Sequence, residues 1–310
     1  MSGIEPHSTI YPQKSAIMLG SFYALLAFFC MALFGILTKI ALKEGSPLWV
    51  SFISYIAGAM LLLPYIARAE FGYLASNNYS FLFGRAFFGT LASFLYTLSI
   101  KSIPVVNGTL LFNTAPIFIP VLGTLFFQTK IAKSIWVAVS FGFLGVIVII
   151  KPTAAIFTQT GDLMGIASGL SLAIAYLLMK RLVATDPVIR IIFYYLALGA
   201  VLQAPWLYLE ETTPAFKSIL YAISGGVALL TAQILLANAY RYALASEVGI
   251  YQYTSVIFVG LLSWLLWGIV PPTRDLIGIV LVIIAGVVII RGGNQTQPSG
   301  NSHSKKTTSI

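Results

Sequence analysis

The sequence has very little charge. Only 9% of its 310 residues are charged, whereas a soluble domain carries about 25%. With a mean hydropathy of +0.92, the chain has too few polar side chains to cover a surface that faces water. This composition excludes a soluble enzyme, a nucleic-acid-binding protein and a disordered scaffold. The net charge of +9 does not indicate nucleic acid, because Lys and Arg occur one or two at a time.

The residues that usually build catalytic or metal centres are also scarce. Cys30 is the single cysteine, so an internal disulfide framework is excluded. Both histidines, His7 and His303, lie in the polar ends of the chain and leave no histidine metal site. No paired carboxylates, Ser/His pair or phosphate loop occurs in an apolar segment. We therefore expect no catalytic residue, no metal and no cofactor, and we do not expect ATP-driven transport by this chain alone.

What the sequence has instead is long uncharged runs. Five stretches contain no Asp, Glu, Lys or Arg: 15–38, 45–67, 102–129, 218–240 and 248–273. Roughly 20 apolar residues let a helix cross the hydrocarbon core of a bilayer. The first run is longer than the apolar part of a signal peptide and continues into Lys39, so we expect it to be retained. Ten spans are predicted, at about 17–40, 47–67, 81–101, 104–127, 133–150, 162–181, 188–208, 217–240, 246–268 and 273–290.

The loops between these spans are short, and the two ends are polar. Ten spans put both ends on one side, and that side carries twelve of the 18 Lys and Arg residues. By the positive-inside rule, both termini are expected in the cytoplasm. We expect an N-terminal tail over 1–16 and a disordered C-terminal tail over 292–310.

The two halves resemble each other at an offset of about 140 residues. Pro47 then falls on Pro187, Lys39 on Lys180, and residues 143–151 on 284–291. Five spans per half is an odd number, so the second copy must be inverted in the membrane. The predicted fold is an all-α integral membrane protein with inverted five-helix repeats at 17–151 and 162–291. Inverted repeats are typical of secondary transporters, although an old duplication in a protein without transport activity would leave the same pattern.

Three segments carry a resemblance to a known family. They are Arg85-Ala-Phe-Phe-Gly, Asn113-Thr-Ala-Pro-Ile-Phe-Ile-Pro and Gly142-Phe-Leu-Gly-Val-Ile-Val-Ile-Ile-Lys-Pro. Together they resemble EamA-type transporters of the drug/metabolite transporter superfamily. The stretch Tyr251-Gln-Tyr-Thr-Ser most resembles the S-adenosylmethionine-transporter-like group.

The resemblance implies a ten-helix fold, small organic metabolites as cargo, and a cavity lined by spans 1, 3, 4, 6, 8 and 9. The sequence departs from the family in two places. The family's Gly-Glu pairs after spans 4 and 9 are replaced by Gln128-Thr129 and Gly268-Ile269, and Pro116 has no counterpart at Val256.

Polar side chains within the spans are the candidate site residues, because such groups tend to face a cavity or another helix. Helical spacing gathers several of them on matching faces of the two halves. The candidates for binding the substrate are Tyr96, Asn113, Thr114, Tyr176, Gln233, Asn238, Tyr251 and Thr254. The candidates for coupling or charge pairing are Glu247, Arg85, Arg241 and Lys39.

Each candidate also has a structural explanation. Glu247 follows Ser246 at a predicted helix start, where an acid complements the helix dipole. Lys39 can extend to the headgroups, and Arg85 can mark the cytoplasmic end of its span. Gln233 and Asn238 can form hydrogen bonds between helices, and the tyrosines can pack against helices or lipid.

The predicted function is a secondary transporter of the inner membrane. It would move an amino-acid-like, nucleoside-like or amphipathic cationic metabolite by alternating access between the repeats. The alternative is an uncoupled channel or facilitator for small solutes. The expected partners are the small-molecule substrate and the lipid bilayer, with no nucleic acid, and a homodimer stays open.

Overall fold

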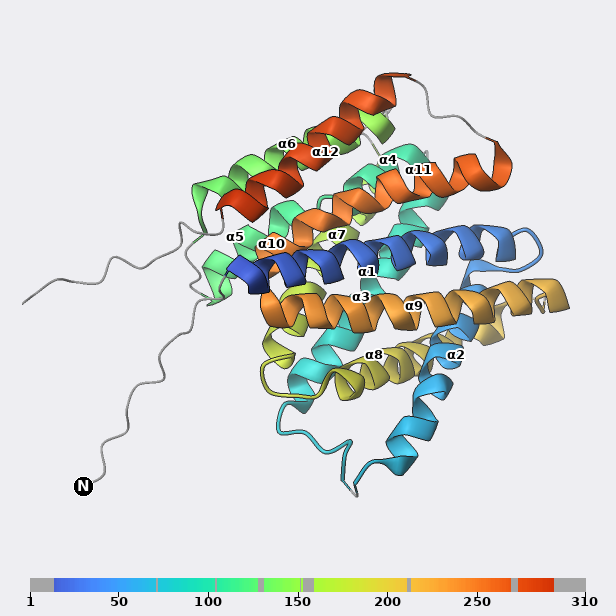
Figure 1. Ribbon diagram of the computed structural model, residues 1–310. Coiled ribbons are helices and arrows are strands. Elements are labelled where there is room, and N and C mark those ends of the chain that lie inside the picture. Colours follow the sequence, from blue (N-terminus) through green and yellow to red (C-terminus); the bar gives the residue numbers. More distant parts are fainter. Residues whose placement is uncertain are drawn as a thin grey trace, which may run out of the picture.

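A computed structural model of the chain is a bundle of long helices (Figure 1). It describes residues 14–70, 72–103, 105–127, 131–150, 152, 159–210, 213–268 and 273–292. Gln128, Thr129, Ile269 and most of both predicted tails lie outside the described residues. The first helix begins at Lys14, within the predicted tail, because the apolar run already starts at Ser15.

The first half contains six helices. They are α1 (Lys14–Ala41), α2 (Pro47–Arg68), α3 (Tyr79–Ser102), α4 (Val105–Phe112), α5 (Ala115–Phe127) and α6 (Lys133–Ile150). The second half contains α7 (Thr160–Leu182), α8 (Val188–Gln203), η1 (Ala204–Leu209), α9 (Phe216–Tyr242), α10 (Ala245–Ile250), η2 (Tyr251–Tyr253), α11 (Thr254–Trp267) and α12 (Thr273–Gly292). Helix occupies each of the ten predicted spans, but the fourth and ninth are broken.

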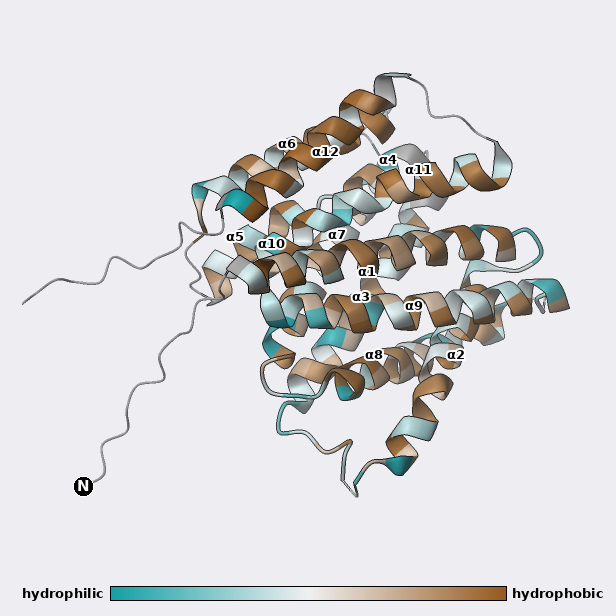
Figure 2. Ribbon diagram, viewed as in Figure 1, coloured by the Kyte–Doolittle hydropathy of each residue, from teal (hydrophilic) through white to brown (hydrophobic). Residues whose placement is uncertain are grey.

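Helix length and surface composition fit a membrane. Among the described residues, nine helical stretches are long and apolar enough to cross a bilayer, and a shorter apolar helix, Leu276–Arg291, forms the tenth. Large apolar side chains face outward, including Leu125 and Phe126, which are 69% and 74% exposed. Figure 2 shows hydrophobic colouring along most of the helices and hydrophilic colouring mainly near their ends. Such a surface is favourable in lipid and unfavourable in water.

The packing is symmetric on exchange of the halves. Helix α1 packs on α9, and the corresponding pair, α7 and α3, also packs together. The same exchange relates the α2–α9 contact to the α8–α3 contact, while α2–α8 and α6–α12 are contacts between equivalent helices. Helix α1 begins and α12 ends at the same side of the bundle, on the left in Figure 1. This arrangement is the one expected of two inverted repeats.

Two spans are interrupted at equivalent positions. Helices α4 and α5 separate at Asn113–Thr114, and the three residues of η2 separate α10 from α11. Pro116 follows only the first break, so proline does not explain both. At each break a threonine hydroxyl donates to the carbonyl three residues earlier: Thr114 to Leu111 over 2.5 Å and Thr254 to Tyr251 over 2.6 Å. Such local hydrogen bonds compete with the helical ladder and bend the helix.

Candidate functional site

A buried arginine lies where the two halves meet. Arg85 of α3 is 1% exposed, and its Nη2 donates a 2.9 Å hydrogen bond to Oε1 of Gln233 on α9. Its Cζ lies 4.1 Å from the ring centroid of Tyr195 on α8. The tyrosines of α2, α7 and α9 are within electrostatic range of the guanidinium. We call this group the arginine cage: Arg85, Gln233, Tyr55, Tyr176, Tyr195 and Tyr240.

The cage lies on the symmetry relation between the repeats. The hydroxyls of Tyr55 and Tyr195 share a 2.6 Å hydrogen bond, and the two residues are 140 positions apart. That separation equals the repeat offset, so each tyrosine is the other's equivalent. The rings of Tyr176 and Tyr240 lie 5.9 Å apart beside them. A ligand held here would contact both repeats.

Glycines create the space that the cage side chains occupy. A Cβ atom on Gly89 would lie 2.4 Å from Nη1 of Arg85 and 2.8 Å from Cε2 of Tyr195. A Cβ atom on Gly199 would lie 2.4 Å from the Tyr55 ring. Helices α3 and α8 can therefore carry large polar side chains between them only because their facing positions lack side chains.

The interrupted spans bring other predicted residues together. Nε2 of Gln252 donates to Oδ1 of Asn113 over 3.4 Å, which joins the two breaks. The hydroxyl of Tyr96 bonds that of Thr109 over 3.0 Å. The predicted residues Asn113, Thr114, Tyr251 and Thr254 thus belong to the breaks and not to the cage. Asn238 stays with its own helix, because its Nδ2 donates to the carbonyl of Ile234.

The remaining charged candidates lie at helix ends. Oε2 of Glu247 accepts a 2.9 Å hydrogen bond from the backbone N–H of Leu244 and so caps the start of α10. Lys180, which is not among the candidates, binds the carbonyls of Tyr240 and Ala243 at the end of α9, over 2.5 and 2.8 Å. Nζ of Lys39 is 5.1 Å from the Trp267 ring centroid, and Arg241 is exposed. Of the four charged candidates, only Arg85 enters the cage.

Replacement of Glu247 by glutamine is expected to leave transport within about twofold of wild type. The amide oxygen can still accept from Leu244. The change removes the charge that complements the helix dipole, about 0.5 kcal/mol, and its attraction to Lys180. Counterflow in proteoliposomes and thermal unfolding in detergent would measure both effects, with the exposed Glu44→Gln as control. A folded Glu247→Gln protein that no longer exchanges cargo would instead make Glu247 a coupling residue.

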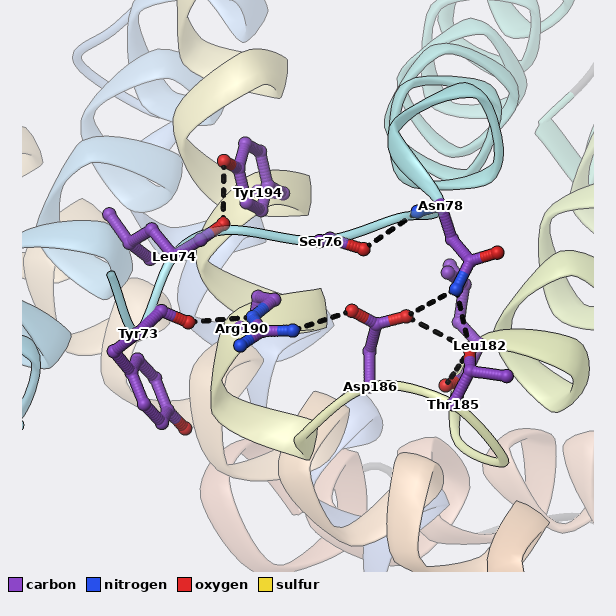
Figure 3. A network of polar contacts seen from close by, with 9 residues as sticks. All are labelled: Tyr73, Leu74, Ser76, Asn78, Leu182, Thr185, Asp186, Arg190 and Tyr194. Atoms are coloured by element: carbon purple, nitrogen blue, oxygen red, sulfur yellow. Dashed lines mark hydrogen bonds and ion pairs between the residues drawn. The ribbon is translucent and has the colours of Figure 1, made fainter. Parts of the chain in front are cut away.

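A polar network lies at the end of the bundle where α7 ends and α3 and α8 begin, and Figure 3 shows its side chains. It joins the loop 72–78 of the first repeat to the turn between α7 and α8. Asp186 accepts hydrogen bonds from Nη1 of Arg190 at 2.8 Å and from Nδ2 of Asn78 at 3.2 Å. Arg190 and Tyr194 also hold backbone carbonyls of this loop, those of Tyr73 and Leu74. We call Asn78, Asp186, Arg190 and Tyr194 the loop latch.

The loop latch is polar and borders open space. A cavity of about 440 Å³ is lined by Ala75, Ser76, Asn77, Asn78, Thr185, Asp186 and Arg190. Burial raises the pKa of the Asp186 carboxyl, but hydrogen bonds from Ser76, Arg190, Thr185 and Asn78 outweigh it and hold the pKa below its ordinary value. The carboxylate is therefore ionised at neutral pH, as a charged latch requires.

The opposite end of the bundle carries an equivalent but uncharged contact. There the hydroxyl of Ser218 donates to the carbonyl of Ala41 over 2.9 Å, and the N–H of Ala215 donates to the carbonyl of Glu44 over 3.2 Å. The repeat offset places Ser218 at the position of Asn78. Equivalent loops thus close both ends, and an ion pair stabilises only the end with the loop latch among the described residues.

We expect Asp186→Asn to loosen the loop latch by about 1 kcal/mol, roughly fivefold in the open population. Hydrogen exchange of segment 72–78 at pH 7 would measure this opening, with Glu44→Gln as control. Because the latched pKa lies below the released pKa of about 3.9, the wild-type advantage is complete above that value. It is lost as pH falls from there through the latched pKa. Equal exchange of the wild type and Asp186→Asn at pH 7 would contradict this role.

Only some residues of the arginine cage are among the residues predicted from the sequence. Arg85, Gln233 and Tyr176 were among the candidates, but Tyr55, Tyr195 and Tyr240 were not. Tyr55 and Tyr195 lie on spans 2 and 7, outside the six spans that the family resemblance implied for the cavity. The repeat offset was the signal that could have paired them. The loop latch is absent from the predicted site because Asn78 and Asp186 lie in short loops, and only polar residues within the spans are candidates.

Comparison with known proteins gives a consistent result. The model of the EamA-like transporter family matches residues 18–151 and 159–291. A pseudopaline exporter of Pseudomonas aeruginosa is 26% identical over 281 residues, which cover 90% of this chain and 96% of the relative. An S-adenosylmethionine uptake transporter of Rickettsia bellii is 26% identical over 244 residues, 78% of this chain and 82% of the relative.

Two further comparisons bear on function class and fold. A riboflavin transporter of Vibrio cholerae is 25% identical over 239 residues, covering 76% of this chain and 80% of the relative. A protein of known crystal structure superposes with a TM-score of 0.76 at 18% identity, over 92% of this chain and all of that one. The predicted fold and the prediction of a transporter instead of an enzyme are confirmed.

Proposed function

The chain belongs to the EamA-like transporter family and moves small metabolites across a membrane, and we propose that it does so by alternating access around the arginine cage. The observation that carries the proposal is the position of Arg85. It is buried on α3 of one repeat and bonded to Gln233 of the other. Cargo bound at a junction between repeats can be exposed to each side in turn when the repeats rock against each other.

The two end contacts supply the gates that this mechanism needs. Opening the loop latch would expose the cage from one side, and opening the Ser218–Ala41 contact would expose it from the other. Because only the loop latch contains an ion pair among the described residues, the contacts at the two ends differ in strength. This difference favours the state in which the loop latch is closed, and cargo binding would then shift the equilibrium.

The orientation follows from charge. Both termini would lie in the cytoplasm, because twelve of the 18 Lys and Arg residues belong to that side. The loop latch lies on the side where α1 begins (Figure 1), so it would be the cytoplasmic gate. The membrane would be the inner membrane of the cell.

Counterflow is the assay that tests the proposal without assuming a direction. The similar proteins include an exporter and uptake transporters, so direction does not follow from similarity. Proteoliposomes would be loaded with a mixed metabolite extract, and exchange would be followed by mass spectrometry. We expect saturable exchange of a restricted set of species, competed by excess unlabelled cargo.

The main alternative, an uncoupled channel or facilitator, makes a different prediction in the same assay. A channel gives flux that does not saturate and shows no counterflow. Either of these results would contradict alternating access. Absence of any exchange by folded protein from the full extract would contradict it as well.

A further inference from the structure

The charge of Arg85 has no partner of opposite sign. Its Nε and Nη1 are buried without a hydrogen-bond acceptor, and no carboxylate forms an ion pair with it among the described residues. Gln233 is neutral and satisfies only Nη2. Buried charges in proteins are normally paired, because removing an ion from water is costly. The guanidinium of Arg85 therefore lacks both a counter-ion and two hydrogen-bond acceptors.

No acid on the surrounding helices could complete it. The sequences of α2, α3, α8 and α9 contain no Asp or Glu, and α7 contains only Asp162. Asp162 belongs to the first turn of α7, where Oδ2 accepts a 2.8 Å hydrogen bond from the N–H of Gln159. Tyr176 of the cage follows 14 residues later, roughly 21 Å along the helix. Asp186 and Glu247, outside these helices, already bond Arg190 and the N–H of Leu244. An anion from outside the chain is therefore the expected partner.

On these grounds we infer that the cargo carries a carboxylate that binds Arg85 in the arginine cage. The inference rests on the proposed function, since it names the cargo class of that same site. The free N–H groups of Nε and Nη1 would donate to the carboxylate oxygens. The hydroxyl of Tyr240, also buried without a partner, offers a further donor. A purely cationic cargo is disfavoured because the guanidinium would repel it.

The tyrosines suit the organic part of such a cargo. Four aromatic rings lie near the guanidinium, and one of them, Tyr195, already stacks on it. Aromatic faces bury apolar or planar groups and keep a polar edge available for hydrogen bonds. Inorganic anions would leave these faces unused. An organic carboxylate, amino acids included, uses both features.

The path to the cage passes through the loop latch. Asn78 precedes α3 seven residues before Arg85, and Arg190 lies five residues before Tyr195 on α8. The same two helices therefore carry the latch at their ends and the cage one to two turns further in. Release of Asp186 from Asn78 would separate these ends and admit an anion to Arg85.

The test compares a carboxylate with its methyl ester. Each acid would be added as a competitor of cargo exchange, and its methyl ester would be added in a parallel assay. The acids are the cargo identified by counterflow or a panel of amino acids and mono- and dicarboxylates. Nucleosides, polyamines and inorganic phosphate complete the panel. In the wild type, esterification is expected to weaken competition by about 30-fold or more, the range of lost charge-assisted hydrogen bonds.

Variants of Arg85 then assign this preference to the guanidinium. In Arg85→Gln the difference between acid and ester is expected to fall to within about threefold, and Arg85→Lys should restore part of it. The matched control is Arg181→Gln, because Arg181 is exposed and packs on Phe81 outside the cage. Gel filtration would establish folding of each variant.

The outcomes separate the two proposals. Exchange limited to nucleosides, polyamines or phosphate, or equal competition by acid and ester in the wild type, would overturn the carboxylate inference while transport stands. An acid preference that persists in folded Arg85→Gln would overturn the role of this residue. The ester comparison in the wild type needs no variant, so misfolding of Arg85→Gln leaves the inference testable. No exchange at all would overturn the proposed function itself.

Discussion

Replacing Gly89 by alanine is expected to reduce exchange by about 10- to 100-fold while the protein stays folded. A Cβ at this position would overlap Nη1 of Arg85 and crowd the ring of Tyr195. The tip of Arg85 is the nearest obstacle and can rotate, but the buried Tyr195 ring must shift as well, so a small loss of thermal stability is expected beside the loss of exchange. The displaced guanidinium would lose charge-assisted hydrogen bonds to cargo, about 1.5–3 kcal/mol.

The measurement is counterflow at subsaturating cargo together with thermal unfolding in detergent. Gly35→Ala on α1 and Gly260→Ala on α11 are matched controls, since a Cβ on either would have no neighbour within 4 Å. Both controls should exchange cargo at the wild-type rate. Normal exchange by Gly89→Ala would show that cargo transport does not depend on the position of the Arg85 guanidinium.

Replacing Gly145 by alanine is expected to lower the stability of the protein and to leave its binding of cargo unchanged. A Cβ on Gly145 of α6 would lie 2.7 Å from the carbonyl oxygen of Gly278 on α12, and a Cβ on Gly278 would lie 2.6 Å from the carbonyl oxygen of Gly145. The obstacle is backbone in both cases, so the two helices must separate. Such overpacking costs typically 1–3 kcal/mol, and about 2 kcal/mol is expected here.

Thermal unfolding in detergent would show this loss as a lower midpoint for Gly145→Ala and for Gly278→Ala. Gly286→Ala on the same helix α12 is the control, because its Cβ would meet Tyr251 only at an ordinary 3.8 Å. The control should be neutral or slightly stabilising, since alanine favours helix over glycine. An unchanged midpoint for both Gly145→Ala and Gly278→Ala would mean that α6 and α12 do not pack closely in the membrane.

The contrast between Gly89 and Gly145 also shows the limit of the sequence. Both are glycines in apolar helices, and hydropathy treats them alike. One faces the tip of an arginine and the other faces a backbone carbonyl, and only the packing of the helices distinguishes them. The sequence interpretation of Arg85 was limited for the same reason. It recognised a charge near the end of a span but not its burial beside Gln233, 148 residues away.

The breaks in the fourth and ninth spans were partly predictable. A proline such as Pro116 can bend the fourth span, whereas the ninth span has Val256 at the equivalent position. The structure breaks both spans, with Thr114 and Thr254 making equivalent hydrogen bonds. The repeat offset related these two threonines from the sequence alone, but the hydrogen bonds that they make depend on local backbone geometry.

The sequence by itself determined the membrane environment, the ten spans, the repeat and its inversion. These follow from a local rule, because each residue either tolerates hydrocarbon or does not, and a helix satisfies its backbone without help from other segments. Tertiary structure decided the arginine cage and the loop latch. Their members come from segments more than 100 residues apart, such as Asn78 and Asp186 in two loops. Which of their faces meet depends on helix rotation and on close approach at glycines, and both are properties of the packed bundle.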